Sequence, residues 1–462
     1  MRIGDSGEDS DPWADEEHAK MQTNWFLLAC LVLCFSSAEA IKSFQRPPHT
    51  DFQIGPDNVT QHAGYIAVNG TLGYKTNIFY WMFESRNDPS TDPVVIWFTG
   101  GPGCSSEIAL FYENGPYSIN KDLGLKINPY SWNSFATIIY VDQPVGTGFS
   151  YGEGLLDIDI NEDQVARDMY EFLQNLFEKY PQYSKLPFYV TGESYAGHYI
   201  PAVSYKIYQE NEKGQNPKIN LKGLAIGNGW VDPYAQYPAY RDFADSRGSL
   251  NTTTRILADI ALAACQGLID TGVWPAAFVE CSYYMEGMLG AIAYQEGFYP
   301  NVYNVDEVCQ YPPLCYDFSL VDKFLAQPKI QEVLSVTGRS WSECSQVVHT
   351  EMLGDWMTNL DVHIPELLKA GMEVLVYSGE LDFICNWIGG NYWTSNLEWA
   401  HKAEFNEQKL EEWKVNGKVA GWAKNYDNFT FLKVAKAGHM VPLDQPENAL
   451  AMLKVFLSGG KW

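Results

Sequence analysis

A serine in a sharp strand-to-helix turn is the first residue of this sequence that could do covalent chemistry. Ser194 lies in the run GESYAG, between an apolar stretch at Phe188–Thr191 that predicts a strand and a stretch that predicts a helix. This context is typical of the nucleophile elbow, in which strained backbone angles expose the serine. His198 is one helical turn further on and is turned away from the hydroxyl, so we expect it to support the helix. The serine needs a separate base and an orienting carboxylate.

Both partners follow later predicted strands. Asp382 comes soon after the apolar run Met372–Ser378, and His439 comes soon after Phe429–Val434. The chain order serine, acid, histidine is the order found in folds that carry a nucleophile elbow. The sequence therefore predicts that Ser194, Asp382 and His439 form a catalytic triad.

Backbone donors for an oxyanion are expected from two places. One is the N–H of Tyr195, directly after the nucleophile, and the other is the N–H of Gly101 in the glycine-rich run Gly100–Gly103. This run follows a predicted strand at Val94–Thr99. It is not a phosphate-binding loop, because no Lys-Ser/Thr pair ends it and it lacks GxGxxG spacing.

The elements that must position these residues alternate along the chain. The clearest helical pattern is at Asn161–Tyr180, whose apolar residues have helical spacing. The predicted strands are 64–68, 79–83, 94–99, 137–141, 188–191, 221–226, 374–378 and 429–434. Alternating strands and helices predict a mostly parallel or mixed sheet with helices on both faces.

One long stretch differs from this pattern. Residues 230–345 are rich in cysteine, show little strand alternation and contain helical runs such as Thr254–Ala264. We interpret them as a helical cap inserted between two parts of one core, residues 41–229 and 346–462.

The N-terminal region predicts a signal peptide over residues 1–40. Its apolar run Trp25–Phe35 is too short for a bilayer, which needs about 20 residues, but fits the core of a signal peptide. Ala38-Glu39-Ala40 is a suitable cleavage site. Residues 1–20 are unusually acidic for such a leader, so translation from Met21 is an alternative start. Secretion would suit the four N-x-[ST] acceptors at Asn58, Asn69, Asn251 and Asn428.

The composition excludes several classes of function. The 57 Asp+Glu against 31 Lys+Arg give a formal charge of −26, which argues against nucleic acid as a partner. The content of 46% hydrophobic residues is enough for a packed core. No metal or other cofactor is expected. The acids from Asp157 begin like a calcium loop, but its sixth position is Glu162 instead of glycine, and His363-x-x-Glu366 lacks a second histidine.

Several segments together resemble the serine carboxypeptidases, which have the α/β-hydrolase fold, and are most similar to the plant vacuolar type III enzymes. The similarity runs from about Asn58 to the C-terminus. It is carried by Trp97–Ser106, Tyr112–Asn120, Asn128–Tyr151, Gly192–Pro201, Ile226–Pro233, Gly379–Gly390 and Gly438–Pro446.

The resemblance implies how a substrate is held. The substrate's C-terminal carboxylate would be bound by Trp97, Thr99, Gly100, Glu113 and Glu193, with Thr99 in place of the family's usual asparagine. A protonated Glu193 could donate a hydrogen bond to this carboxylate, whereas an ionised one would repel it. The residue before the scissile bond would lie in an apolar pocket formed by Tyr195, Trp230, Tyr237, Tyr240, Ile384, Cys385 and Met440.

The cysteines left after signal cleavage suggest three disulfides and one free thiol in an oxidising compartment. The resemblance implies the pairs Cys104–Cys344, Cys265–Cys281 and Cys309–Cys315, with Cys385 free.

These features together favour a carboxypeptidase that works on peptide C-termini at acid pH. The expected location is the secretory route, ending in a vacuole, a lysosome-like compartment or outside the cell, and the expected state is a monomer or homodimer without a stable membrane span. One alternative is an acyltransferase that uses an ester donor, although such relatives often have GDSYSG where this chain has Glu193 and Ala196. Another is a non-catalytic binding or protective protein, which the complete triad disfavours.

Overall fold

The computed structural model describes residues 53–70, 73–460 and 462, and the predicted signal peptide lies outside them. Ten strands of the described chain form one sheet in the order β1-β2-β6-β3-β7-β8-β11-β14-β13-β12. Their bounds are β1 Gln61–Asn69, β2 Lys75–Phe83, β3 Val94–Phe98, β6 Thr137–Val141, β7 Phe188–Glu193, β8 Leu221–Gly227, β11 Glu373–Gly379, β12 Glu411–Val415, β13 Lys418–Tyr426 and β14 Phe429–Val434. The strands from β6 to β14 in this order are parallel, and antiparallel pairs complete both edges. This is the α/β-hydrolase fold that the sequence predicts.

Helices cover both faces of the sheet because the central strands are apolar on both sides. In β3, Ile96 packs into the core on one face, while Val95 and Trp97 pack into the core on the other. The helices α3 Glu162–Lys179, α4 Ala196–Lys213, α12 Ile364–Lys369, α13 Trp387–Asn396 and α14 Lys402–Glu407 contribute to the first core. The helices α2 Glu107–Tyr112, α9 Ser319–Leu325, α15 Val441–Asp444 and α16 Pro446–Ser458 contribute to the second.

The ends of the predicted elements are close to the observed ones. The strands predicted at 137–141 and 429–434 have the observed bounds, and the predicted helix at 161–180 is α3 with one residue fewer at each end. Asn161 caps this helix, since its side chain accepts a hydrogen bond from the Gln164 N–H at 3.1 Å. The edge strands β12 and β13 are absent from the predicted set.

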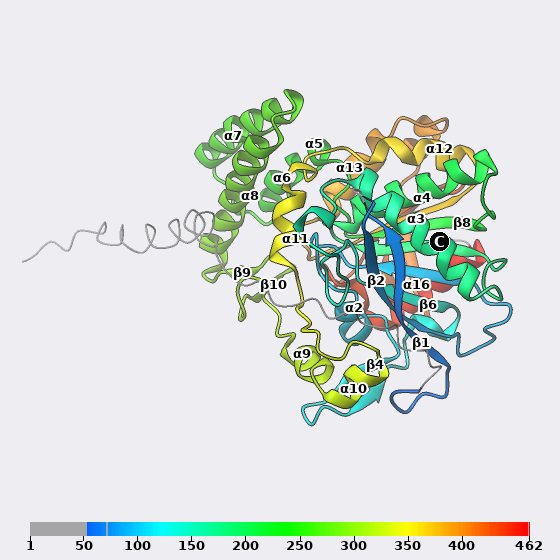
Figure 1. Ribbon diagram of the computed structural model, residues 1–462. Helices are drawn as coiled ribbons and strands as arrows, with labels where there is room; N and C mark the ends of the chain where they lie inside the picture. Colours follow the sequence, from blue (N-terminus) through cyan, green and yellow to red (C-terminus); the bar gives the residue numbers. More distant parts are fainter. Residues whose placement is uncertain (1–52, 71–72, 461) are drawn as a thin grey trace, which may run out of the picture. The chain divides into compact units, whose positions relative to one another are not determined.

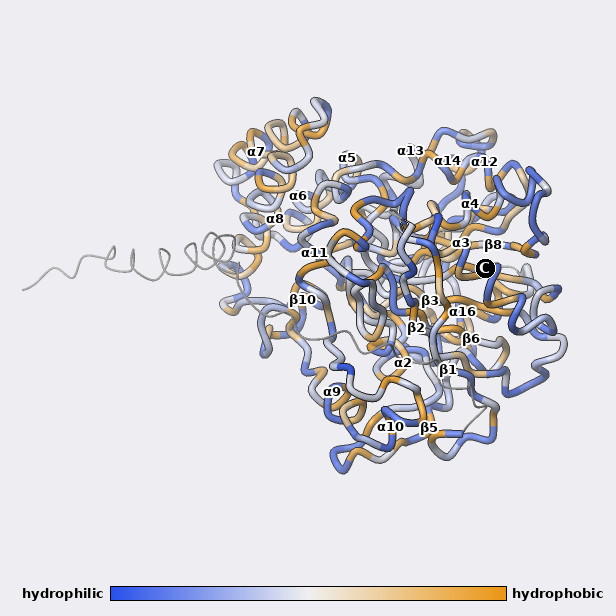
Figure 2. The backbone as a smooth tube through the Cα atoms, viewed as in Figure 1, coloured by the Kyte–Doolittle hydropathy of each residue, from blue (hydrophilic) through white to orange (hydrophobic). Residues whose placement is uncertain are grey.

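The stretch interpreted as an insertion is mostly helical. It contains α5 Pro233–Gln236, α6 Pro238–Ser246, α7 Thr252–Asp270, α8 Trp274–Glu296 and α10 Pro328–Val333, with the short strands β9 Pro300–Asn301 and β10 Asn304–Val308, and α11 Gln346–Glu351 follows it. The remaining short strands are β4 Tyr117–Ile119 and β5 Leu125–Ile127. The helices α7 and α8 form a hairpin outside the sheet, with hydrophobic residues along both helices (Figures 1 and 2). No helix in the described part of the chain is long and apolar enough to cross a membrane.

Candidate active site

The turn between β7 and α4 holds Ser194 in a strained conformation. Its φ of 67° lies in the left-handed region that non-glycine residues rarely adopt. Two backbone hydrogen bonds fix the turn, because the Ser194 N–H donates to the Gly227 carbonyl at 3.0 Å and the Trp230 N–H donates to the Ser194 carbonyl at 2.9 Å. A side chain at Gly197 would place its Cβ 2.5 Å from the Trp230 carbonyl oxygen. Glycine is therefore required for the elbow to pack this closely.

Asp382 and His439 are brought together from the loops after β11 and β14. His439 Nδ1 lies 2.8 Å from Asp382 Oδ2, and both side chains are buried. Asp382 accepts three further hydrogen bonds, from Asn228 Nδ2 at 2.7 Å, from the Ile384 N–H at 3.1 Å and from the Cys385 N–H at 3.3 Å. Among the described residues, His439 Nε2 has no hydrogen-bond partner, so this nitrogen is available to a nucleophile. The pair thus has the geometry of an oriented base.

Asn228 and Tyr303 support this pair, although the sequence analysis named neither. The Asn228 backbone has a φ of 40°, and its side chain joins Asp382 to the start of the acid loop by accepting from the Gly379 N–H at 3.2 Å. The Tyr303 carbonyl accepts the His439 backbone N–H at 2.7 Å. The only local signal for Asn228 is its place directly after β8, at the same edge of the sheet as the triad.

His198 is not part of the triad geometry. Its Nδ1 lies 2.6 Å from the Trp230 carbonyl oxygen, and its ring stacks on Tyr195 with centroids 4.6 Å apart. Burial lowers the pKa of His198 to about 4, so Nδ1 of a neutral ring is the donor. The histidine fixes the start of α4 against the segment after β8.

The glycine-rich loop after β3 rests directly on the turn that holds Ser194. A Cβ at Gly100 would lie 2.4 Å from the Tyr195 backbone nitrogen, and Gly101 has a φ of 116°. Within the described chain, the N–H groups of Gly101 and Tyr195 donate to no protein acceptor. Both N–H groups are therefore available to an acceptor outside the protein.

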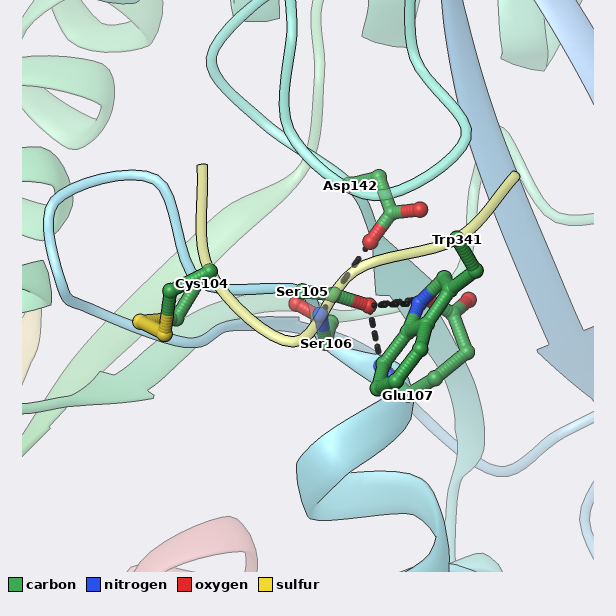
Figure 3. The surroundings of a disulfide bond; sticks show 7 residues. Cys104, Ser105, Ser106, Glu107, Asp142 and Trp341 are labelled. Atoms are coloured by element: carbon green, nitrogen blue, oxygen red, sulfur yellow. Dashed lines mark hydrogen bonds between the residues drawn. A yellow bond between two sulfur atoms is a disulfide. The ribbon is translucent and has the colours of Figure 1, made fainter. Parts of the chain in front are cut away.

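A disulfide and a neighbouring segment brace this loop (Figure 3). Cys104 is bonded to Cys344, and the Ser345 N–H donates to the Gly103 carbonyl at 2.8 Å. Beside the disulfide, Trp341 Nε1 donates to Ser105 Oγ at 2.8 Å. The segment that follows α10 thus holds the loop in place.

Two buried carboxyl groups, Glu113 and Glu193, interact with each other. Burial raises the pKa of Glu113 to about 7. Burial also raises the pKa of Glu193 well above its usual range, and the neighbouring Glu113 carboxyl raises it further. Glu193 consequently keeps its proton more firmly than an ordinary glutamate. On the adjacent loop, Trp97 Nε1 donates to Thr99 Oγ1 at 3.1 Å, which leaves the hydroxyl hydrogen of Thr99 free to donate.

Aromatic side chains gather next to the elbow. Trp230 and Tyr237 pack edge to face at 5.1 Å, and Tyr240 Oη donates to the Ile384 carbonyl at 2.6 Å. Cys385 is a buried free thiol whose pKa is raised by burial and by Asp382. These residues and Tyr195 pack on the same face of the sheet, whereas Met440 packs on the opposite face with Trp97.

Three further aromatic residues, which the sequence analysis did not select, pack against this group. The Trp356 ring lies 5.0 Å from that of Tyr195, Phe278 packs on Trp356 at 5.5 Å, and Tyr284 contacts Tyr237 at 6.5 Å. Phe278 and Tyr284 come from α8, so this helix reaches the neighbourhood of the elbow.

A family model for serine carboxypeptidases matches residues 48–459. The chain belongs to the serine carboxypeptidase family. It is 44% identical to "Serine carboxypeptidase-like 49" of Arabidopsis thaliana, with 86% of this chain and 77% of the relative covered. It is 41% identical to "Serine carboxypeptidase 3" of Oryza sativa subsp. japonica, with 88% and 80% covered.

A solved structure of the same family has a similar fold. The prohormone-processing carboxypeptidase of Saccharomyces cerevisiae is 28% identical and superposes with a TM-score of 0.78, over 88% of this chain and 93% of that one. Family membership places the chain among hydrolases that act on peptides, and the sequence analysis identified the family correctly.

The disulfides in the described chain are Cys104–Cys344, Cys265–Cys281 and Cys309–Cys315, the pairs that the family resemblance implies. Such bonds are consistent with the secretory pathway.

The glycosylation acceptors differ in accessibility. Asn58, Asn69 and Asn251 are exposed. Asn428 is half-buried, and its Nδ2 donates to the carbonyls of Leu368 and Met372 at 2.9 and 2.8 Å. A glycan on the folded protein would disrupt these bonds, so Asn428 is the acceptor least suited to modification.

Proposed function

We propose that this protein is a secretory-pathway carboxypeptidase that removes C-terminal amino acids from peptides at acid pH through an acyl-enzyme. The observation that carries the proposal is the buried Glu113–Glu193 pair beside the glycine-rich loop and the oriented His439. A protonated acid pair can donate a hydrogen bond to a free carboxylate, which distinguishes an exopeptidase from a general esterase.

The chemistry would follow from the triad. Ser194 Oγ attacks the last peptide carbonyl while His439 Nε2 takes its proton, and the N–H groups of Gly101 and Tyr195 stabilise the oxyanion. His439 then passes the proton to the leaving amino acid, and Asp382 holds the ring throughout. Water attacks the resulting ester by the same route and releases the shortened peptide.

Binding would use the two faces of the sheet differently. Trp97, Thr99, Gly100, Glu113 and Glu193 would hold the carboxylate. The aromatic group around Trp230, Tyr237 and Tyr240, with Ile384 and Cys385, would accept an apolar side chain. Met440 belongs to the same core as Trp97, so in this proposal it lies on the carboxylate side of the site. The cap boundaries at 230 and 345, and delivery to a vacuole, a lysosome-like compartment or the exterior, belong to the same proposal.

A substrate comparison tests this function. Purified protein is incubated at about pH 5 with a blocked dipeptide acid, with its amide, and with a glucose ester plus an alcohol. We expect release of the C-terminal amino acid from the acid, with loss in Ser194→Ala and retention in Ser204→Ala, a buried serine on α4, the helix that follows the Ser194 turn. Turnover of the ester alone would identify an acyltransferase, and absence of all turnover by folded protein would identify a binding protein.

A further inference from the structure

A cavity of about 330 Å³ lies apart from the proposed catalytic residues. It is lined by Gly148, Phe149 and Ser150 from the loop after β6, and by Gly338, Arg339 and Ser340 from the segment between α10 and α11. Its size is at the lower end of the range for small-molecule sites, which is about 300–1,000 Å³. No acidic side chain lines it.

Arg339 differs from the other arginines that the structure describes. Arg86, Arg167, Arg241, Arg247 and Arg255 each form an ion pair with an aspartate or glutamate, whereas Arg339 forms none with any described residue. In a chain of formal charge −26, an arginine without a carboxylate partner is unexpected. Its guanidinium carbon lies 3.1 Å from the centre of the Tyr151 ring, which holds the group by a cation–π contact and leaves its N–H groups available.

The other groups around the cavity are also donors. Among the described residues, the backbone N–H groups of Gly148, Gly338 and Ser340 meet no acceptor. Two of the nearby acceptors are already used. The Phe149 carbonyl accepts from Tyr65 Oη at 3.1 Å, and Ser150 Oγ accepts from the Phe79 N–H at 2.7 Å. Free backbone N–H groups beside a guanidinium form a typical binding site for an anion.

Two carboxyl groups lie beneath the loop after β6, and neither is free to pair with the arginine. Asp142 accepts from the Phe149 N–H at 2.7 Å and from the Ser106 N–H at 3.2 Å (Figure 3). Glu107 accepts a hydrogen bond from the Ser105 hydroxyl. Burial and the neighbouring Asp142 raise the pKa of Glu107 well above its usual range. A Glu107 carboxyl that keeps its proton reduces the negative potential beneath the cavity.

We propose that this cavity binds the oxyanion group of a small molecule, a phosphate or a carboxylate, through the Arg339 guanidinium and the surrounding backbone N–H groups. The planar fork of an arginine can donate two parallel hydrogen bonds to two oxygens of such a group. The site is separate from the proposed peptidase site and does not depend on it.

Titration calorimetry at about pH 5 tests the site, with orthophosphate, a phosphomonoester and succinate as the probes in separate titrations. The three probes distinguish inorganic phosphate, an organic phosphate and a dicarboxylic acid as the source of the oxyanion. We expect saturable binding of at least one probe, and at least a tenfold weaker Kd in Arg339→Gln. Arg247→Gln, which removes an arginine paired with Glu296 and Asp306, should leave the Kd unchanged.

A second variant guards against a folding defect in Arg339→Gln. Ser340 is exposed, and Ser340→Glu would place a carboxylate beside the guanidinium, so probe binding should be lost. Thr337→Glu adds the same charge at an exposed residue outside the lining and should weaken binding less than threefold. Absence of binding by the unaltered protein, or an equal Kd in Arg339→Gln, would overturn the proposal.

Discussion

Replacing Glu113 by glutamine should change the pH at which a peptide's free carboxylate loses affinity. Both members of the Glu113–Glu193 pair have raised pKa values, and that of Glu113 is about 7. The neutral pair, which accepts a carboxylate, is therefore fully present at low pH and is lost as pH rises through about 7. Above this pH the pair carries a negative charge that repels the negative charge of the substrate's C-terminal carboxylate.

The expected change in affinity for a peptide acid follows from the pKa of Glu113. At pH 5 about 1% of Glu113 is ionised, and at pH 8 about 90% is, so the affinity for a peptide acid should fall about tenfold between the two. The Glu113→Gln variant has no carboxyl group at position 113 that could ionise near pH 7. Its affinity for the acid should therefore fall only at the higher pH at which Glu193 loses its proton. The variant should consequently bind the acid nearly equally at pH 5 and pH 8.

The assay is titration calorimetry in a Ser194→Ala background, so that turnover does not affect the Kd. A blocked dipeptide acid and its amide are compared from pH 5 to pH 8, and Glu332→Gln, at an exposed glutamate, serves as the matched control. The amide should show no fall, because it has no carboxylate to be repelled. A constant Kd for the acid, or the same fall for the amide, would refute the reasoning.

Three other perturbations address the surrounding structure. Asn228→Ala removes the 2.7 Å donor to Asp382 and should lower kcat about 10- to 100-fold with little change in KM, measured by steady-state kinetics on the dipeptide acid. Loss of the Cys104–Cys344 bond by paired serine substitutions should lower the free energy of unfolding by about 2–5 kcal/mol, measured by urea denaturation, and lower kcat because the disulfide braces the oxyanion loop. Glu162→Gln should raise the thermal midpoint at pH 8 but not at pH 5, because burial raises the pKa of Glu162 and an ionised form destabilises the fold.

The sequence predicts best the elements whose environment is uniform. β6 and β14 are buried along almost their whole length, so their apolar runs mark both ends. β12 is mostly exposed and reads EEWKV, with a single buried tryptophan, so an apolar run could not reveal it. Its pairing with β13 depends on a neighbouring strand and not on its own composition.

The candidate site divides in the same way. The placement of Ser194, Asp382 and His439 after central strands could be read from local pattern, since carboxyl ends of parallel strands share one edge of the sheet. Tyr303 could not, because it contributes a backbone carbonyl to His439 and any residue type could do so. Trp356 was missed because its contact with Tyr195 joins residues far apart in the sequence.

Acid pH suits this chain for reasons beyond the substrate. Besides Glu113 and Glu193, the buried acids Glu107, Asp159 and Glu162 have pKa values raised well above their usual range, in each case chiefly by burial. Such groups stabilise the fold fully below their unfolded pKa, about 4, and this stability is lost as pH rises through their folded values. Since the same rise in pH ionises the acid pair that we assign to the substrate carboxylate, we infer that activity and stability share one acid range. At acid pH these buried carboxyl groups among the many acids of this chain are thus protonated. They lie at the positions where an ionised carboxylate would destabilise the fold most.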